Sequence, residues 1–279
     1  MRFPLSPAVF PADVLPAGNV SFNSMSIEAY LYNIPGLAER FVYFNNDMML
    51  NAPVEPSTFF APHPVSGIVG PRMYVEGVDW RRDPVPGELN VADKKALGKY
   101  DGLASQSGLD GYTTGLYNMH YLLDAMFGYE PRPQVLHQGV PSTVSAYRRA
   151  FELFPEALTR TGKTLFRSED NVIPHHLALW TAIYEQKAVR LDPSDDPRSY
   201  FLAFTQDTQT NVPIFSLGLN SNPYDLLCIN DGTNFDHLSH ASINKVVAQV
   251  EGFFEAINAQ QIARFGYGPR VLPPNATLS

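Results

Sequence analysis

Residues 41–47 read Phe-Val-Tyr-Phe-Asn-Asn-Asp, a short aromatic and β-branched run that ends in a polar cluster. Such a run predicts a buried strand over Phe41–Phe44, followed by a turn. A second stretch repeats the pattern, because Leu226-Leu227-Cys228-Ile229 leads into Asn230-Asp231. Ligands of open α/β sheets bind beyond the carboxyl ends of the strands, so both clusters are candidate oxygen donors to a divalent cation. Asn and Asp also begin turns after strands, and that simpler interpretation stays open.

Further elements are predicted around these two strands. Apolar spacing and capping residues predict a helix from Asn23 or Ser24 to about Asn33, helices over 114–127 (ended by Gly128) and 143–154, a helix capped by Asp170 and running to about Glu185, a strand over 200–204, and a helix over 239–259. The inward positions of the last helix are taken as 243, 246, 247, 250, 253, 254 and 257. Strands that alternate with helices indicate an α/β fold.

Composition narrows the function classes. The chain has 279 residues, of which 44% are hydrophobic, and 20 Lys and Arg stand against 28 Asp and Glu, a net charge of −8. This apolar content fills a core and excludes a disordered polymer. The acidic balance argues against a general nucleic-acid binder. Cys228 is the single cysteine, so no disulfide forms within the chain.

Neither a membrane span nor a signal peptide is predicted. The apolar runs fall far below the ~18–20 residues of a spanning helix, and the first seven residues have no apolar core region. A cytoplasmic, bacterial-type location is the resulting expectation. We expect a single α/β domain over residues 1–264 with a loop-rich insertion over 51–115, in which 67–76 hold a strand or hairpin, and a loose tail over 265–279.

Several polar residues are candidates for chemistry. His137 follows an extended segment, where an imidazole is able to act as a general base, although a lone His is more often structural. Arg167, in Phe-Arg-Ser-Glu-Asp at 166–170, offers a planar fork to phosphate beside a predicted helix start, or else pairs with Glu169 or Asp170. His237 and His240 lack the partners of a zinc set. The sequence has no serine-nucleophile elbow, phosphate-binding P-loop or dinucleotide fingerprint.

Three blocks of the chain resemble the Stealth family of hexose-1-phosphoryltransferases. The first runs from Asn19 through Glu28 and from Ile34 through Asp47, and continues over 54–60. The second comprises Leu136-His137-Gln138, residues 154–157 and residues 166–170. The third is Leu227-Cys228-Ile229-Asn230-Asp231. Asn46 stands where the family's block has a carboxylate, and the family's opening strand block does not precede Met1, so we expect N-terminal strands of the fold to be missing.

The resemblance implies a fold and an activity. The fold is a Rossmann-like nucleotide-sugar transferase sheet flanked by helices. The activity is transfer of a hexose-1-phosphate, such as N-acetylhexosamine-1-phosphate, from a UDP-sugar to a sugar hydroxyl. UMP is released, and a phosphodiester forms in capsular or cell-surface polysaccharide. The implied partners are a UDP-hexose and a polysaccharide acceptor, and a homo-oligomer or a peripheral association with the inner face of the membrane is compatible with the sequence.

The resemblance also implies residue roles. His137 takes the acceptor proton, Arg167 neutralises the transferred phosphoryl group, and Asp47 and Asp231 hold Mg²⁺ or Mn²⁺. Asn23, Glu28 and Asn230 orient donor or acceptor, and the remaining substrate-binding candidates are Ser24, Asn46, Arg132 and Asp170. The alternatives are a metal-dependent glycosyltransferase, an inactive sugar-phosphate-binding fragment, and a subunit that needs a partner chain.

Overall fold

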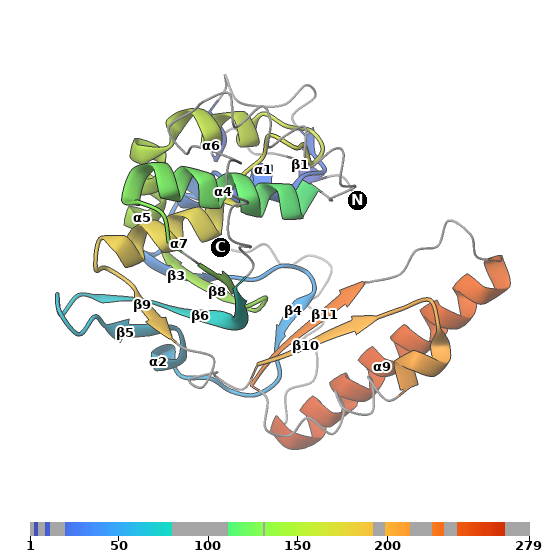
Figure 1. The fold of residues 1–279 in the computed structure, drawn as a ribbon. Coiled ribbons are helices and arrows are strands. Elements are labelled where there is room, and N and C mark those ends of the chain that lie inside the picture. Colours follow the sequence, from blue (N-terminus) through green and yellow to red (C-terminus); the bar gives the residue numbers. More distant parts are fainter. Residues whose placement is uncertain are drawn as a thin grey trace. The chain divides into compact units, whose positions relative to one another are not determined.

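The computed structural model describes residues 3–4, 9–11, 20–79, 111–130, 132–191, 199–212, 225–231 and 239–265 (Figure 1). The chain divides into two compact units. Unit 1 comprises Met1–Tyr43, Pro56–Leu136 and Val140–Asp196, and unit 2 comprises Phe44–Glu55, His137–Gly139 and Pro197–Ser279. Helices and strands occur in both units, so the mixed α/β class is confirmed, and the single catalytic domain over 1–264 stays a prediction.

Small β-sheets make up the strand part of unit 1. β1 (Phe3–Pro4) pairs antiparallel with β2 (Val20–Ser21), and β3 (Arg40–Tyr43) pairs antiparallel with β8 (Val140–Thr143). In a larger sheet, β6 (Val69–Asp79) pairs antiparallel with β5 (Phe60–Pro62) and β7 (Pro133–Val135), and parallel with β9 (Val189–Leu191). The strand or hairpin predicted within 67–76 is confirmed as a strand, because β6 covers most of this range. Residues 51–79 contain more helix and strand than a loop-rich insertion implies. Residues 80–110 of the predicted insertion lie outside the described residues.

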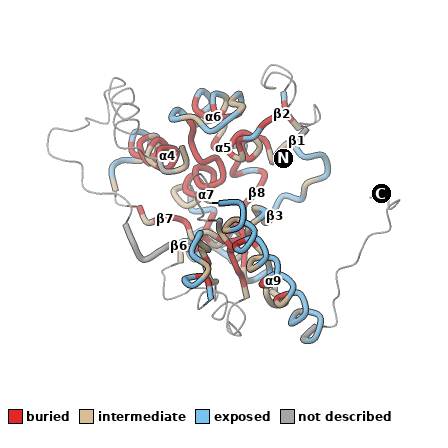
Figure 2. The backbone as a smooth tube through the Cα atoms, turned by 90° about the vertical axis from the view of Figure 1, so that its right-hand side faces the viewer, coloured by how far each residue is buried: buried red, intermediate tan, exposed pale blue. Residues whose placement is uncertain are grey.

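Helices bury the core of unit 1. They are α1 (Ser24–Glu28), a 3₁₀ turn (Leu31–Asn33), α2 (Pro56–Phe59), α4 (Gly111–Phe127), α5 (Val144–Leu153), α6 (Pro155–Gly162) and α7 (Pro174–Tyr184). α7 is buried along residues 174–182, which Figure 2 shows as a red tube. An all-round apolar helix of this kind belongs to the interior of a domain. Trp180 and its neighbours on α7 pack into the main apolar cluster with α4 and α5.

Local signals placed several helix ends of unit 1 correctly. The Asn23 side chain accepts a hydrogen bond from the Met25 N–H at 3.1 Å and caps α1. Thr143 caps α5 in the same way through the Ala146 N–H. Gly128 follows α4 with a φ of +93°, a conformation that favours glycine. These termini depend on contacts between near neighbours, which is why the sequence predicts them.

Other predictions for unit 1 were wrong in extent. The helix expected to reach Asn33 ends at Glu28 and gives way to the 3₁₀ turn. The helix expected from Asp170 begins at Pro174, because residues 169–171 form a turn in which the Asn171 N–H donates to the Ser168 carbonyl. β3 is only partly buried, and among the described strands it pairs with β8 alone.

The described part of unit 2 contains a three-stranded sheet, a short helical segment over residues 208–212 and one long helix. β10 (Ser199–Phe204) runs parallel to β11 (Leu226–Asp231), and β11 pairs antiparallel with β4 (Met48–Leu50). α9 (His240–Phe265) packs on this sheet, and its Phe253 and Ile257 share a buried cluster with residues of β10 and β11. The strands predicted over 200–204 and 226–229 are confirmed.

α9 buries fewer of its apolar residues than predicted. Val246, Phe253 and Ile257 are buried, whereas Val247 and Phe254 are 44% and 41% exposed. Each residue turns a helix by about 100°, so a position directly after a buried one leaves the contact face. The helix also continues six residues beyond Ala259, and residues 266–279 of the predicted tail lie outside the described residues.

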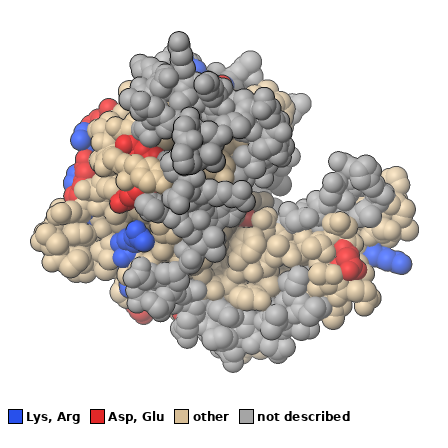
Figure 3. All heavy atoms as spheres, in the orientation of Figure 1, with Lys and Arg blue, Asp and Glu red and all other residues tan. Residues whose placement is uncertain are grey.

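The described surface carries its charges in scattered groups. In the view of Figure 3, small groups of Lys and Arg are interspersed with small groups of Asp and Glu. Within the described ranges, no helix has both the length and the apolar character that crossing a bilayer requires.

A glycine in β6 gives a test of the larger sheet. A Cβ at Gly70 would lie 1.7 Å from the Lys187 carbonyl oxygen, whereas a Cβ at Gly252, within α9, has open space. We expect Gly70→Ala to destabilise unit 1 by about 1–3 kcal/mol. The same change at Gly252 should be neutral or stabilise by roughly 0.5–1 kcal/mol. Urea denaturation followed by circular dichroism measures both, and equal stability of Gly70→Ala and wild type would contradict this packing.

Candidate functional site

Asp47 lies in unit 2 at the entry to β4. Its carbonyl accepts a hydrogen bond from the Ile229 N–H at 2.7 Å, and the neighbouring Met48 lies opposite Cys228 in the strand register. The loop before it is closed by a hydrogen bond from the Met48 N–H to the Asn45 carbonyl at 3.1 Å. These backbone bonds hold the Asp47 side chain against the middle of β11.

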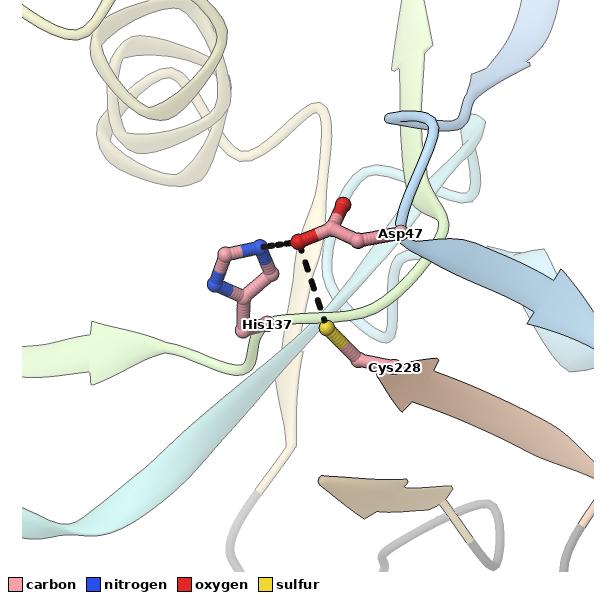
Figure 4. A group of neighbouring side chains, drawn as sticks. All are labelled: Asp47, His137 and Cys228. Atoms are coloured by element: carbon pink, nitrogen blue, oxygen red, sulfur yellow. Dashed lines mark hydrogen bonds and ion pairs between the residues drawn. The ribbon is translucent and has the colours of Figure 1, made fainter. Parts of the chain in front are cut away.

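His137 and Cys228 meet the Asp47 carboxylate from two other segments of unit 2 (Figure 4). His137 Nε2 lies 3.5 Å from Asp47 Oδ2, and the Cys228 thiol donates to the same oxygen at 3.6 Å. The side chains of Asp47 and His137 keep 21% and 23% of their surface exposed, whereas Cys228 is buried. The His137 ring lies 5.8 Å from the Phe201 ring, measured between centroids.

The electrostatics of the three groups centre on Asp47. Burial by itself raises the pKa of Asp47, but the His137 ring, a backbone N–H and the Cys228 thiol outweigh it and lower that pKa below its usual value. The carboxylate is therefore ionised at neutral pH. Burial, and then the Asp47 charge, raise the pKa of the Cys228 thiol well above its ordinary range.

The order of the groups limits their chemistry. Asp47 stands between His137 and Cys228, whereas an activated cysteine nucleophile needs the imidazole next to the thiol and a lowered pKa. The arrangement suits a different use, in which Asp47 polarises His137 or shares a cation with it. A carboxylate beside an imidazole orients the ring and stabilises its protonated form.

The two polar clusters that the sequence predicts at strand ends contain further candidate residues, which are close in sequence to Asp47 or to Cys228. Asn46 is exposed in the turn before β4, and Asn230 is half-buried on β11, on the same strand face as Cys228 by the alternation of a strand. Asp231 ends β11, and its side chain lies outside the described residues. The predicted pairing of Asp47 with Asp231 therefore stays a prediction, and the structure brings Cys228 to Asp47.

Arg167 lies on the surface of unit 1 in an irregular segment, not at the start of a helix as predicted. Its Nη2 donates a long hydrogen bond of 3.4 Å to the half-buried Ser24 hydroxyl. Among the described residues no ion pair joins it to Glu169 or Asp170. A Cβ at Gly111, the first residue of α4, would lie 3.0 Å from the Cβ of Arg167. The helix beside Arg167 is thus α4.

An aromatic pair adjoins Ser24 and Arg167 in sequence. Phe22 and Phe166 stack with centroids 5.2 Å apart and remain 41% and 60% exposed. Exposed, nearly parallel rings form an apolar surface of a kind that sugars and bases stack on. Sequence reasoning did not single out either phenylalanine, although each directly flanks a residue that was predicted.

Glu28 occupies a buried polar cluster of unit 1. Its Oε2 lies 2.7 Å from His175 Nδ1, and the Tyr43 hydroxyl donates to its Oε1 at 3.2 Å. Burial by itself raises the pKa of Glu28, but His175, the Tyr43 hydroxyl and the Arg167 charge outweigh it and lower that pKa below the usual 4.5. The sequence indicated Glu28 but not His175, because 147 residues separate the two.

Asn23 and Asp170 take positions in the local architecture of unit 1. Asn23 is completely buried, and its amide donates to Thr164 Oγ1 at 2.7 Å and to Asn171 Oδ1 at 2.8 Å. Asp170 is exposed, its N–H donates to the Ser168 hydroxyl, and its carbonyl accepts from Arg160. A substrate contact of either residue stays a prediction.

Arg132 is completely buried in unit 1. Its Nη1 donates to Asp124 Oδ1 at 2.6 Å, its Nη2 donates to the Gly128 carbonyl at 3.1 Å, and the guanidinium lies 5.3 Å from the Tyr184 ring centre. A buried charge needs this degree of pairing. The environment gives Arg132 a structural role, and its predicted substrate contact stays a prediction.

Comparisons with known proteins agree with the sequence resemblance. Stealth protein CR2, conserved region 2, matches residues 8–67. An exopolysaccharide phosphotransferase of Nocardia farcinica is 27% identical over 245 residues, 85% of this chain and 41% of the relative. Exopolysaccharide phosphotransferase CpsY of Mycobacterium tuberculosis is 24% identical over 239 residues, 84% of this chain and 38% of the relative.

A shorter relative is matched over more of its length. Exopolysaccharide phosphotransferase cps2G of Lactiplantibacillus plantarum is 26% identical over 254 residues, 89% of this chain and 69% of the relative. The chain thus spans about two fifths of the length of the Nocardia and Mycobacterium relatives. Conserved region 2 contains Asp47, whereas His137 and Cys228 lie beyond it.

The Glu28 cluster makes a pH-dependent prediction. A lowered native pKa means that the carboxylate stabilises the fold fully above about pH 4.5 and loses this contribution as the pH falls through the native pKa. Glu28→Gln should cost roughly 1–3 kcal/mol at pH 7, because an NH2 group replaces one of the two oxygens that contact His175 and Tyr43, and the negative charge is lost. The difference from wild type should shrink below pH 4.5.

Urea denaturation at several pH values measures the effect. Glu169→Gln, at an exposed position of the same unit and outside any helix, is the matched control and should behave like wild type at every pH. A destabilisation by Glu28→Gln that did not change with pH would refute the electrostatic explanation.

Proposed function

Since the chain carries conserved region 2 of the Stealth proteins and is a distant homologue of bacterial exopolysaccharide phosphotransferases over most of its length, we propose that it transfers a sugar-1-phosphate from a nucleotide sugar to a hydroxyl of a polysaccharide acceptor. The donor class is a UDP-hexose, such as a UDP-N-acetylhexosamine. The observation that carries the proposal is the His137–Asp47 pair, because a partly exposed imidazole held beside an ionised carboxylate suits proton transfer from a hydroxyl.

The proposed step is a displacement at the β-phosphorus of the donor. The acceptor hydroxyl oxygen bonds to this phosphorus while its proton passes to His137, and the bond between the phosphorus and the oxygen that bridges to the α-phosphate breaks. UMP leaves, and the sugar-1-phosphate becomes a phosphodiester. Such transfers depend mainly on positioning and charge neutralisation.

The geometry suggests how His137 works. Its Nε2 faces the Asp47 carboxylate, and its other ring nitrogen points away from Asp47 (Figure 4). The negative charge of Asp47 favours the tautomer with its proton on Nε2, which leaves Nδ1 as the basic nitrogen for the hydroxyl. The negative charge of Asp47 then stabilises the imidazolium that forms.

A divalent cation is part of the proposal. Mg²⁺ takes one or two carboxylates together with the phosphates of its substrate, and it neutralises charge on them. Asp47 fits this need, because its Oδ1 is buried without a hydrogen-bond partner among the described residues. Asp47, with Asp231 as the second predicted ligand, would hold Mg²⁺ or Mn²⁺.

Arg167 is proposed to bind a phosphate group of the substrate. Its guanidinium is exposed, and its recorded polar contact is the long bond to Ser24, so most of its donors face solvent. Phe166, the residue before Arg167, stacks on Phe22, and this aromatic pair suits a sugar or base ring. Asn46 and Asn230 are proposed to orient substrate near His137.

The remaining expectations belong to the same proposal. They are a Rossmann-like sheet, a role in capsular polysaccharide synthesis, and a cytoplasmic location at the inner face of the membrane, where nucleotide sugars are available. A metal-dependent glycosyltransferase would use similar residues but would release UDP, so the nucleotide product separates the two reactions. A binding fragment would show nucleotide-sugar binding by calorimetry without turnover.

Removing the proposed base should abolish most of the activity. With a UDP-N-acetylhexosamine and an oligosaccharide acceptor, His137→Ala should lower kcat by about 10²–10⁴-fold. Chromatographic measurement of UMP gives the rate. His240→Ala, at an exposed position of α9 in the same unit, is the matched control and should keep the wild-type rate. A His137→Ala rate equal to wild type, or UDP as the product, would refute the assignment.

Replacing Arg167, the residue proposed to bind phosphate, should also lower the rate of transfer. Arg167→Ala should lower kcat by about 10²–10³-fold, because a guanidinium that neutralises developing charge acts mainly in the transition state. Arg148→Ala, an exposed position of α5, is the matched control. If both variants turn over at the wild-type rate, Arg167 does not contact the phosphate.

A further inference from the structure

We propose that Asp47, His137 and Cys228 form a binding site for Zn²⁺ or a similar transition-metal cation. Each residue offers one ligand atom, and the three atoms lie within 4.8 Å of one another in unit 2. The proposal concerns cation binding and does not depend on the transfer reaction.

Two of the three separations between the donor atoms match a tetrahedral metal site. Zinc bonds to nitrogen, oxygen and sulfur measure about 2.0–2.3 Å, which places tetrahedral ligand atoms roughly 3.3–3.8 Å apart. Asp47 Oδ2 lies 3.5 Å from His137 Nε2 and 3.6 Å from Cys228 Sγ. The first separation is too long for a good hydrogen bond, and both fit atoms that share an ion.

The types of donor select the class of cation. An imidazole nitrogen and a sulfur suit zinc and its neighbours, whereas Mg²⁺ takes oxygen ligands. This set therefore differs from the oxygen-only site expected for Mg²⁺. Three protein ligands leave a fourth position for water or another oxygen, and the partial exposure of Asp47 and His137 leaves that position access to solvent.

Unsatisfied polar atoms at the site point to a ligand. Asp47 Oδ1 and His137 Nε2 are both buried without a hydrogen-bond partner among the described residues. Buried polar atoms of this kind call for an explanation, and a bound ion is one of the standard ones. A cation at the centre of the three groups would satisfy His137 Nε2 directly and would compensate the charge of the carboxylate.

The supporting structure holds the three residues in place. Cys228 lies in β11, the central strand of its sheet, and the Asp47 backbone is bonded to the same strand. The Phe44 ring packs on Gly139, where a Cβ would lie 2.6 Å from the ring, and Phe201 lies beside the His137 ring. Ligands on rigid elements keep the geometry that a metal needs. When the metal binds, the Cys228 thiol loses its proton to solvent and the thiolate bonds to the metal.

The test uses Co²⁺ as a spectroscopic substitute for zinc on the full chain, reduced and treated with chelator. We expect one equivalent of Co²⁺ to give visible bands of a tetrahedral site and a near-ultraviolet thiolate-to-cobalt band. Zn²⁺ should remove both, and excess Mg²⁺ should not. Absence of the thiolate band, or displacement of Co²⁺ by Mg²⁺ as readily as by Zn²⁺, would overturn the proposal.

Variants assign the ligands. Cys228→Ser should abolish the thiolate band. His137→Ala and Asp47→Asn should weaken binding by more than about tenfold, because even residues that only support metal ligands are worth about 10–100-fold. His240→Ala is the matched control and should bind like wild type. Circular dichroism checks that each variant is folded. Because His137 and Asp47 are partly exposed, we expect their variants to fold and to test the site even if Cys228→Ser is unstable. Co²⁺ binding by His137→Ala and Asp47→Asn that is as tight as binding by wild type refutes the site.

No sugar or nucleotide enters this measurement. A chain that fails the transfer assay but binds Co²⁺ supports the metal site and refutes the proposed reaction, and the opposite result does the reverse.

Discussion

The antiparallel pairing of β4 with β11 is the contact on which the candidate site depends. It places Met48 opposite Cys228, and the Ile229 N–H donates a hydrogen bond to the Asp47 carbonyl. The pairing thereby brings Asp47 next to Cys228, although 181 positions separate the two residues in the sequence. Without this register Asp47 would sit in an ordinary turn between two strands. A one-residue slip would turn alternate side chains to the other face of the sheet and separate the thiol from the carboxylate.

Asp47 has two potential uses that differ in the hardness of the cation. With substrate phosphates, its carboxylate suits Mg²⁺ or Mn²⁺, and the His137 ring beside it remains a base. With the Cys228 sulfur, the same oxygen belongs to a set that prefers zinc. A cation that bonds to His137 Nε2 would occupy the nitrogen that faces Asp47, so the two uses exclude one another at any moment.

In unit 1, contacts between sequence neighbours determine the helix ends, whereas contacts between distant segments determine the environments of several polar side chains. The cap of α1 by Asn23, the start of α5 after Thr143 and the glycine after α4 follow from neighbours in the chain, and the sequence predicts the cap, the helix and the glycine. The environment of Arg167 does not follow from its neighbours. The adjacent Asp170 and Glu169 suggested a helix start or an ion pair, yet tertiary packing sets Arg167 beside Gly111 and Ser24. The sequence did not predict the burial of Arg132 either. Its partner Asp124 lies in α4, and the apolar spacing that predicts this helix gives no role to Asp124.

The sequence by itself determined the α/β class, the two polar strand ends, and the candidates Asp47, His137 and Arg167, because hydrophobic periodicity, capping and motif resemblance are properties of short segments. It also placed Cys228 correctly in a buried strand. Only the tertiary structure decided that the partner of Asp47 is Cys228 as well as His137, and that Glu28 meets His175. The physical reason is that strand register and the packing of distant segments depend on the whole set of contacts within a unit, and no local pattern encodes which side chains those contacts bring together.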